Sequence, residues 1–333
     1  MNVTEWNIPA LLQLSGGYWA ACALHTGVKL NLFNILQDNA KTAEEISAKA
    51  CTNARATGML LDALTSLNLL VKRGNTYENT TFSAKVLDKN SADYAGHIIM
   101  HHHHLMEGWS KLSEAVTIGG PVRGSSSHAD DDMQRESFLM GMFNLASLIA
   151  PLRAATIDLS SCRSLLDLGG GPGTYAIHFC KANPQLTATI FDLSTTRKFA
   201  EDTVQRFNLV ERINFISGDY HVNQVPSGFD AAWLSHVIHS EDAQGSLDLL
   251  RKGVDALDPG GILMVQEFIM NNTKSGRPFP ALFSLNMLLG TKNGQAYSEA
   301  ELKEMMEAAG LSEVVRLNLD LPNGAGVMLG RKL

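Results

Sequence analysis

Two histidines stand where acid–base chemistry could be carried out. The apolar run Phe229–Ser235 has the composition of a buried parallel strand, and His236 and His239 follow it directly. Ligands of open α/β sheets bind beyond the carboxyl ends of the strands, so both side chains are expected at that edge. An imidazole titrates near neutral pH and can take a proton from a reacting group. The sequence therefore offers His236 and His239 as competing candidates for a general base.

A glycine-rich turn follows an earlier apolar run, Ser164–Leu168. Gly169, Gly171 and Gly173 line this turn, where glycine permits positive φ angles and a close approach of the backbone to a ligand. The spacing differs from the G-x-G-x-x-G fingerprint of dinucleotide-binding proteins, because its third glycine would fall on Thr174. The turn is therefore expected to hold a cofactor other than NAD or FAD.

Acidic residues stand at the ends of three successive strands. These strands are predicted at residues 164–168, 187–191 and 213–216. Asp167 suits a cation such as an ammonium group, and Asp192 can accept hydrogen bonds from both ribose hydroxyls. Asp219 can accept from an adenine amine, and Tyr220 can stack on the adenine ring. This order of groups favours S-adenosylmethionine as the ligand.

The motifs resemble those of a known family in their order along nearly the whole chain. LLDLGGGPG (165–173), IFDLS (190–194), SGDY (217–220) and DPGG (258–261) resemble the successive binding motifs of class I methyltransferases. Further segments resemble the small-molecule O-methyltransferases, which include plant caffeate-type enzymes, acetylserotonin methyltransferase and bacterial natural-product methyltransferases. The resemblance implies an α/β fold: a Rossmann-like, seven-stranded class I methyltransferase domain preceded by a mostly helical winged-helix dimerisation domain.

The motifs and the resemblance together predict a cofactor site for S-adenosylmethionine, with S-adenosylhomocysteine as product. The predicted cofactor-binding residues are Asp167, Gly169, Gly171, Gly173, Asp192, Leu193, Gly218, Asp219, Tyr220 and Ser235.

The resemblance also selects between the two histidines. His239 occupies the position of the family's catalytic histidine, although the aspartate and tryptophan that follow it in the family are absent here. Glu267 falls where family members carry a glutamate that orients the base, which would fix the tautomer of His239 and stabilise its imidazolium form. A second family glutamate is replaced by Ala296. The predicted catalytic residues are therefore His239 and Glu267.

A histidine-rich segment precedes the catalytic part of the chain. On a helix, His97, His101 and His104 share one face, where they could ligate a metal or line a substrate cavity. A cavity is favoured over a metal, a polar helix with a partly solvated face stays open as the other interpretation, and no metal is predicted. The predicted substrate residues, several of them implied by the resemblance, are His101, His104, Trp109, Phe138, Met142, His236, Asn286 and Met287.

The domain organisation follows from the same patterns. We predict a winged-helix-like dimerisation domain at 1–95, a helical linker contributing to the substrate pocket at 96–160 and the S-adenosylmethionine-binding domain at 161–333. A winged-helix pattern also suggests a DNA-binding regulator, but the presumptive recognition helix carries only Arg55 as a cation. The resemblance implies a homodimer instead.

Composition limits the remaining classes. The net charge of −7 argues against a general nucleic-acid surface. No run of about 18 apolar residues appears, and Met1–Trp6 lacks the pattern of a secretion signal, so no membrane partner and a cytoplasmic location are predicted. The four cysteines have no metal-type spacing and are expected to be reduced thiols.

The predicted function is methyl transfer from S-adenosylmethionine to a hydroxyl of a small, aromatic or conjugated molecule. Methylation of a thiol or thioether is an alternative, because sulfur is nucleophilic enough to need little base assistance. Methylation of carbon is another, and some relatives of the family use the fold without methyl transfer.

Overall fold

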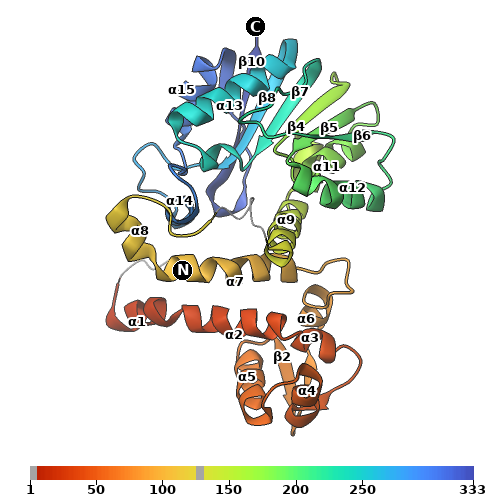
Figure 1. Ribbon diagram of the computed structural model, residues 1–333, viewed down its shortest axis with the longest axis vertical. Coiled ribbons are helices and arrows are strands. Elements are labelled where there is room, and N and C mark those ends of the chain that lie inside the picture. The colour runs from red at the N-terminus through yellow and green to blue at the C-terminus, as the bar shows by residue number, and fades with distance from the viewer. Residues whose placement is uncertain (1–5, 125–130) are drawn as a thin grey trace. The chain divides into compact units, whose positions relative to one another are not determined.

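The computed structural model describes residues 6–124 and 131–333 (Figure 1). Most of the segment used above to argue against a secretion signal, Met1–Glu5, lies outside these residues. Contacts divide the chain into a smaller unit, residues 1–106 with 136–144, and a larger unit, residues 107–135 with 145–333. Each of the helices α7 (Gly96–Ser110) and α9 (Asp132–Ser147) contributes residues to both units. The three-domain division stays a prediction.

The smaller unit begins with short helices around a three-stranded sheet. The helices are α1 (Ile8–Gly16), α2 (Tyr18–Lys29), α3 (Leu32–Ile35), α4 (Ala43–Ala50), α5 (Ala54–Ser66) and α6 (Thr81–Val86). The strands β1 (Lys41–Thr42), β2 (Leu70–Arg73) and β3 (Thr76–Asn79) are antiparallel in the order β1-β3-β2. Thr42 and Glu45 form a capping box at the start of α4, and Gly74 lies in the turn between β2 and β3 with a φ of 60°.

The larger unit is built on a seven-stranded sheet with the order β6-β5-β4-β7-β8-β10-β9. Its strands are β4 (Ser164–Leu168), β5 (Thr187–Asp192), β6 (Ile213–Ser217), β7 (Phe229–Ser235), β8 (Leu257–Phe268), β9 (Leu311–Arg316) and β10 (Ala325–Lys332). The first five are parallel, and β10 is antiparallel to both β8 and β9.

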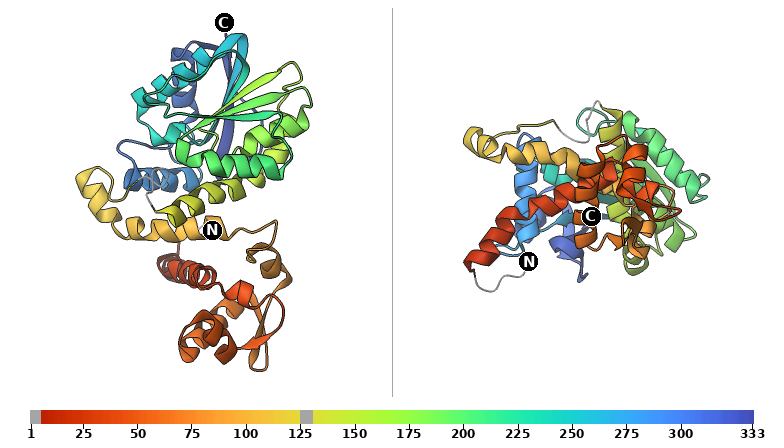
Figure 2. Two further views of the ribbon diagram at one scale, coloured as in Figure 1. Left: turned by 45° about the vertical axis from the view of Figure 1, so that its right-hand side comes forward. Right: turned by 90° about the horizontal axis from the view of Figure 1, so that it is seen from below.

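Helices cover both faces of this sheet (Figure 2). They are α10 (Ala150–Thr156), α11 (Thr174–Ala182), α12 (Arg197–Arg206), α13 (Ala243–Ala256) and α15 (Glu299–Ala308). The larger unit also contains α8 (Leu112–Ile118), which contacts α14 (Pro278–Gly290). Trp233 of β7 packs with α10 and α11 on one face, and Leu234 packs with α13 and α15 on the other. Burial on both faces explains why these strands read as continuous apolar runs.

The carboxyl ends of β4, β5, β7 and β8 meet at one edge of the sheet, which therefore collects the turns that follow them. DPGG was predicted to be a binding motif, but it lies at the opposite end of the sheet from these turns, so that prediction is wrong. Asp258–Gly261 forms the amino-terminal part of β8, whereas Glu267 lies near its carboxyl end. The glycines resemble a binding turn in sequence but lie in the strand itself.

In the described part of the chain, no single helix is both long and apolar enough to cross a membrane. The bent pair α9 and α10 meets that test by length and composition only.

Candidate active site

The glycine turn after β4 needs glycine for two separate reasons. Gly169, Gly171 and Gly173 have φ angles of 70°, 54° and 76°, which L side chains rarely adopt. A Cβ atom on Gly173 would also lie 2.4 Å from Cδ1 of Ile190, and one on Gly170 would lie within 3 Å of the carboxyl group of Asp167. The turn therefore holds its backbone close to β5 and to the carboxylate of Asp167 in β4.

Asp167 is a buried acid at this turn. Its side chain is 1% exposed, and Oδ2 accepts a hydrogen bond from the backbone N–H of Ala176 at 3.2 Å. Burial raises the pKa of Asp167 to about 7, against the hydrogen bond from Ala176, and the charge of Asp192 adds to the increase. A cationic ligand group at this position would restore the ionised form.

Asp192 links the first two turns of the edge. Its Oδ2 accepts from the N–H of Gly171 at 2.8 Å, and its Oδ1 accepts from the N–H of Leu193 at 2.7 Å and from the hydroxyl of Thr196 at 3.0 Å. The carboxylate is thus fixed in place next to the glycine turn.

The turn after β6 carries the residues predicted at the adenine. Asp219 accepts from the N–H of His221 at 2.8 Å, and the Tyr220 hydroxyl donates to Oε1 of Glu241 at 3.3 Å. A Cβ on Gly218 would lie 2.2 Å from Cζ of Phe191, so only glycine fits there. The structure therefore brings this turn beside β5, and its local hydrogen bonds give it a fixed shape.

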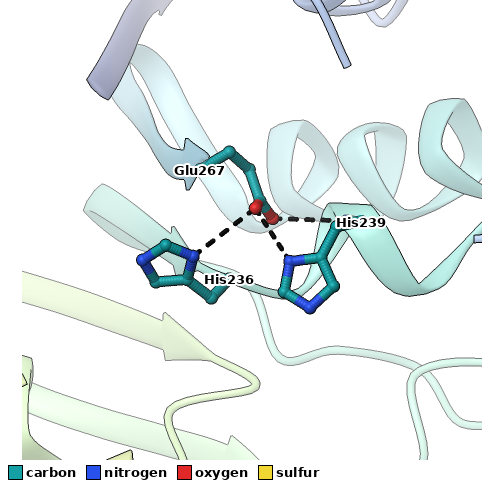
Figure 3. Close-up of side chains that lie close together, drawn as sticks. All are labelled: His236, His239 and Glu267. Atoms are coloured by element: carbon teal, nitrogen blue, oxygen red, sulfur yellow. Dashed lines mark hydrogen bonds and ion pairs between the residues drawn. The ribbon is translucent and has the colours of Figure 1, made fainter. Parts of the chain in front are cut away.

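His239 and Glu267 form a buried pair beyond the ends of β7 and β8 (Figure 3). Nδ1 of His239 lies 2.8 Å from Oε2 of Glu267, and the backbone N–H of His239 donates to Oε1 at 3.3 Å. The side chain of Glu267 is only 3% exposed. This contact leaves Nε2 of His239 as the ring nitrogen that can receive a proton from a substrate.

The carboxylate of Glu267 stays ionised in its buried position. Burial alone would raise its pKa, but the attraction of His239 and His236 and the hydrogen bond from His239 hold the pKa well below its usual range. The pair is therefore suited to stabilise a positive charge on His239.

His236 has an unusual backbone and shares the same carboxylate. Its φ is 56°, in the left-handed region, and its N–H donates to the carbonyl of Gln266 at 2.9 Å. Its Nδ1 lies 3.5 Å from Oε2 of Glu267, and its Nε2 lies 3.2 Å from Nε2 of Gln266. The amide of Gln266 also contacts the hydroxyls of Tyr175 at 2.6 Å and Ser235 at 3.2 Å. The predicted cofactor residue Ser235 is thereby connected to His236.

Two phenylalanines pack against the two histidines, and a third packs against those two rings. The ring of Phe283 meets His239 edge to face at 4.7 Å, and the ring of Phe268 lies 4.3 Å from His236. Phe268 contacts Phe283 at 4.7 Å and Phe279 at 4.8 Å. The base therefore has an apolar, aromatic neighbour on α14.

Other predicted substrate residues of the larger unit lie on or near α14. Met287 is buried, and Asn286 accepts through Oδ1 from Arg123 at 3.2 Å. Trp109 is half-buried. Ala296 is 1% exposed and supplies no second carboxylate, and the Cβ position of its neighbour Gly294 is 2.5 Å from the carbonyl oxygen of His239.

Four predicted substrate residues belong to the smaller unit. His101 is buried, with its ring 5.3 Å from that of Phe138, whereas His104 and Met142 are half-buried. Within this unit the structure brings His101 and Phe138 together. Their role toward a substrate stays a prediction.

The sequence reasoning missed Arg153, which lies on α10 and is 4% exposed. Its Nη2 donates to the carbonyl of Asp320 at 2.9 Å, its Nε has no hydrogen-bond partner, and in the described part of the chain no ion pair joins it to a carboxylate. Burial raises the pKa of Tyr175 to about 12, and the charge of Arg153 is one of the smaller effects that oppose this increase. The sequence feature that could have identified Arg153 is its position as the lone arginine in the apolar segment APLRAAT, residues 150–156.

Comparisons with known proteins agree with this geometry. The O-methyltransferase domain model matches residues 109–312, and the O-methyltransferase dimerisation domain model matches residues 12–89. The 3-hydroxy-5-methyl-1-naphthoate 3-O-methyltransferase of Streptomyces sahachiroi is 32% identical, with 97% of this chain and 95% of the relative covered. The tetracenomycin polyketide synthesis 8-O-methyl transferase TcmO of Streptomyces glaucescens is 28% identical, with coverages of 97% and 96%.

A solved structure supports the same assignment. PigF of Serratia, described as an S-adenosyl-L-methionine-dependent methyl transferase, was solved with SAH. It matches with a TM-score of 0.90 and 25% identity over 98% of this chain and 100% of that one. The predicted family, fold class and cofactor are thus confirmed. The chain belongs to the S-adenosylmethionine-dependent O-methyltransferase family.

Proposed function

We propose that the acceptor is a hydroxyl group on a small aromatic molecule, and that His239 is the general base for its methylation. The observation that carries this proposal is the contact of 2.8 Å between Nδ1 of His239 and the buried, ionised carboxylate of Glu267. A thioether acceptor has no proton to remove and would need no such pair.

The chemistry follows from the atoms of the pair. When bound, S-adenosylmethionine supplies an electrophilic methyl group on a sulfonium centre. Nε2 of His239 takes the proton of the acceptor hydroxyl as its oxygen becomes nucleophilic, and the ring becomes an imidazolium. Glu267 keeps its negative charge, holds Nδ1–H toward itself and stabilises that cation. The Phe283 ring, edge to face with His239, limits rotation of the imidazole.

The cofactor would be held by groups whose charges match its own. Asp167 suits the ammonium group of the methionine part, and Asp192 suits the ribose hydroxyls. Arg153 has a buried charge and a buried Nε without a partner, and a carboxylate is the group that would satisfy both. We therefore assign the cofactor carboxylate to Arg153, near the glycine turn that Tyr175 follows.

The aromatic class of the acceptor rests on the ring cluster of Phe268, Phe279 and Phe283 beside the base. Flat acceptors gain stacking and edge-to-face contacts with such rings. The named relatives include an enzyme that methylates the 3-hydroxyl of a naphthoate. A naphthoate is small and flat, so it belongs to this class of acceptor.

The assembly proposed for the chain is a homodimer. The match to the O-methyltransferase dimerisation domain and the exposed apolar side chains of α1 and α2 support it. The smaller unit, with its three-stranded sheet and helices, would serve this pairing as a winged-helix module rather than DNA binding. The cytoplasmic location stays a prediction.

Substitutions of His239 and Glu267 test whether His239 is the general base. We expect His239→Ala to lower kcat by roughly 10²- to 10⁴-fold while the affinity for S-adenosylhomocysteine stays nearly unchanged, because a general base acts in the transition state. Glu267→Gln should cause a smaller loss, since it affects orientation and charge only. His178→Ala, a half-buried histidine of α11, is the matched control.

The acceptor for this assay is found first by screening hydroxynaphthoates and other phenols for production of S-adenosylhomocysteine. Near-normal turnover by His239→Ala on the acceptor so identified would overturn the assignment and favour methylation of sulfur.

A further inference from the structure

Three potential metal ligands converge at the active site (Figure 3). Nδ1 of His236, Nδ1 of His239 and a carboxylate oxygen of Glu267 all lie within 4.8 Å of one another. Among the residues that the structure describes, this is the one group of three such side chains that is close enough to share an ion. Two of the three residues are buried.

The position of His236 is not explained by the acid–base role of His239. Its Nδ1 is buried and has no hydrogen-bond partner at normal distance. The 3.5 Å to Oε2 of Glu267 is long for a hydrogen bond, and the left-handed backbone of His236 costs free energy. A nitrogen lone pair and a carboxylate that face each other are stabilised by a positive charge between them, either a proton or a metal ion.

The surroundings of His236 fit a metal ligand. A ligating histidine usually donates its second ring N–H to an oxygen. Nε2 of His236 lies 3.2 Å from the amide of Gln266, whose Oε1 is buried without a partner. Rotation of this amide by half a turn, which exchanges its oxygen and nitrogen, would let Oε1 accept from Nε2–H. The hydroxyls of Tyr175 and Ser235 can donate as well as accept, so they would keep their contacts with Gln266.

The distances suit a small ion. Zinc binds imidazole nitrogen and carboxylate oxygen at about 2.0 to 2.2 Å, which places tetrahedral ligands about 3.3 Å apart. The Nδ1 atoms of His239 and His236 lie 2.8 Å and 3.5 Å from Oε2 of Glu267, on either side of this value. Two imidazoles and one carboxylate leave a fourth position for water. This donor set favours zinc and similar divalent transition metals over magnesium or calcium.

We propose that His236, His239 and Glu267 form a binding site for a divalent transition metal ion, with zinc as the best fit, and that the ion inhibits the enzyme. The metal site itself is independent of the proposed function, and only the inhibition rests on it. A metal on Nδ1 of His239 obliges the ring proton to reside on Nε2, the atom that must be free to take the proton of the acceptor. The ion also withdraws Glu267 from its contact with His239.

The test measures metal binding in full-length protein that has been freed of metal with a chelator. Titration with zinc chloride in a calorimeter gives the stoichiometry, and cobalt chloride gives visible absorption bands that report tetrahedral nitrogen and oxygen ligation. We expect one tight site per chain. The prediction of no metal from the sequence considered the histidines of α7, which lie in the smaller unit, and the spacing of the four cysteines. It did not consider His236, His239 and Glu267 together.

Variants identify the ligands. His236→Asn keeps a residue type that tolerates the left-handed backbone but removes the ring nitrogen, and it should weaken zinc binding by more than about tenfold and abolish the cobalt bands. The control is the double variant His103→Ala with His104→Ala, which alters the histidine-rich helix and should leave both readouts unchanged. Loss of the bands in the control with retention in His236→Asn would overturn the proposal.

A second measurement reads the tautomer without any acceptor. In protein labelled with ¹⁵N at histidine, zinc should move the proton of His239 to Nε2, identified by the signals missing from His239→Ala. Unchanged His239 signals at saturating zinc would overturn the site. Metal binding at the three residues combined with full turnover of His239→Ala would instead remove the general base and leave the metal site standing.

Discussion

At the residue scale, the carboxylate of Glu267 is shared by two imidazoles with different surroundings. His239 contacts it at hydrogen-bond distance, through both its ring and its backbone N–H, and is edge to face with Phe283. His236 is farther from it and is held through Gln266. The two histidines therefore share one negative charge, and His239, the closer of the two, is the proposed base, because attraction between an imidazolium and a carboxylate grows stronger as the distance between them falls.

Arg153 should affect the protein in opposite directions with and without cofactor. Replacing a buried, unpaired guanidinium by an apolar side chain removes a desolvation cost, so Arg153→Met should raise the free energy of unfolding of the ligand-free protein. The same change should weaken binding of S-adenosylhomocysteine roughly 10- to 100-fold, because a charged hydrogen-bond partner is lost. Urea unfolding and calorimetry measure the two effects.

Arg163→Met, a change at an exposed arginine of the same unit, is the control and should alter neither quantity. Unchanged cofactor affinity in Arg153→Met would place the cofactor carboxylate elsewhere.

Asp167 should couple cofactor binding to pH. Its pKa in the ligand-free protein is raised by burial to about 7, and a bound ammonium group would lower it. The bound state then carries fewer protons than the free state below pH 7. Affinity for S-adenosylhomocysteine should therefore rise as the pH increases from 5 to about 7 and level off above that.

Calorimetry at pH 6 in buffers of different ionisation enthalpy measures this proton release directly. Asp167→Asn should bind more weakly and release no proton at this site. Release of equal size in the variant would show that another group is responsible.

Candidate site residues could be named from the sequence only where a pattern marks them, and their roles stay predictions. His239 and Glu267 stand in motifs that resemble those of a family, and the acids at strand ends follow from the strands themselves. Arg153 was missed because its importance comes from burial and from the absence of an ion pair in the described chain, which a sequence does not show. The approach of His236 to Glu267 depends on a left-handed residue after β7 and was equally invisible.

At the element scale, the turn between β4 and α11 fixes the geometry of the cofactor edge. Gly173→Ala should destabilise the fold more than Gly171→Ala, although both residues have positive φ. A left-handed alanine costs about 1 to 2 kcal/mol at either position. Only at Gly173 would the added Cβ meet Ile190, at 2.4 Å, while the Cβ position of Gly171 is open. This overlap should cost about 1 to 3 kcal/mol more.

Urea unfolding of the two variants in parallel gives the difference in free energy of unfolding. Equal losses would mean that β5 moves aside without cost.

The strands were the most predictable elements. Buried parallel strands are apolar throughout, so 164–168 and 229–235 coincide with β4 and β7. The start of β8 was not predictable, because Asp258, Pro259 and two glycines are typical of a turn. Asp258–Gly261 lies where the pairing of β8 with β7 is irregular, between Leu257 and Ile262, and before the pairing with β10 begins at Ile262.

At the scale of the whole molecule, we expect the exposed apolar surface of the smaller unit to be buried against a second copy of the chain. Large side chains of α1 and α2 are more than half exposed, namely Ile8, Leu11, Leu12, Leu14, Tyr18 and Trp19. We expect a stable dimer in sedimentation at micromolar concentration. Leu12→Asp should shift the protein toward monomer, because it introduces a charge into a buried apolar contact.

The control is Val222→Asp, an equally apolar and more exposed position of the larger unit, which should sediment like the unaltered protein. A monomeric unaltered chain would refute the proposed pairing.

These exposed side chains also have a genetic consequence. Since each subunit would offer its own α1 and α2 to a copy of itself, a subunit altered there meets unaltered subunits made in the same cell. Mixed pairs would be less stable than pairs of unaltered chains, so unaltered chains would still pair with one another, and an allele with a charge at Leu12 should be recessive. Cells that carry only the Leu12 allele should lack the dimer, whereas cells that carry only an allele altered at Val222 should keep it.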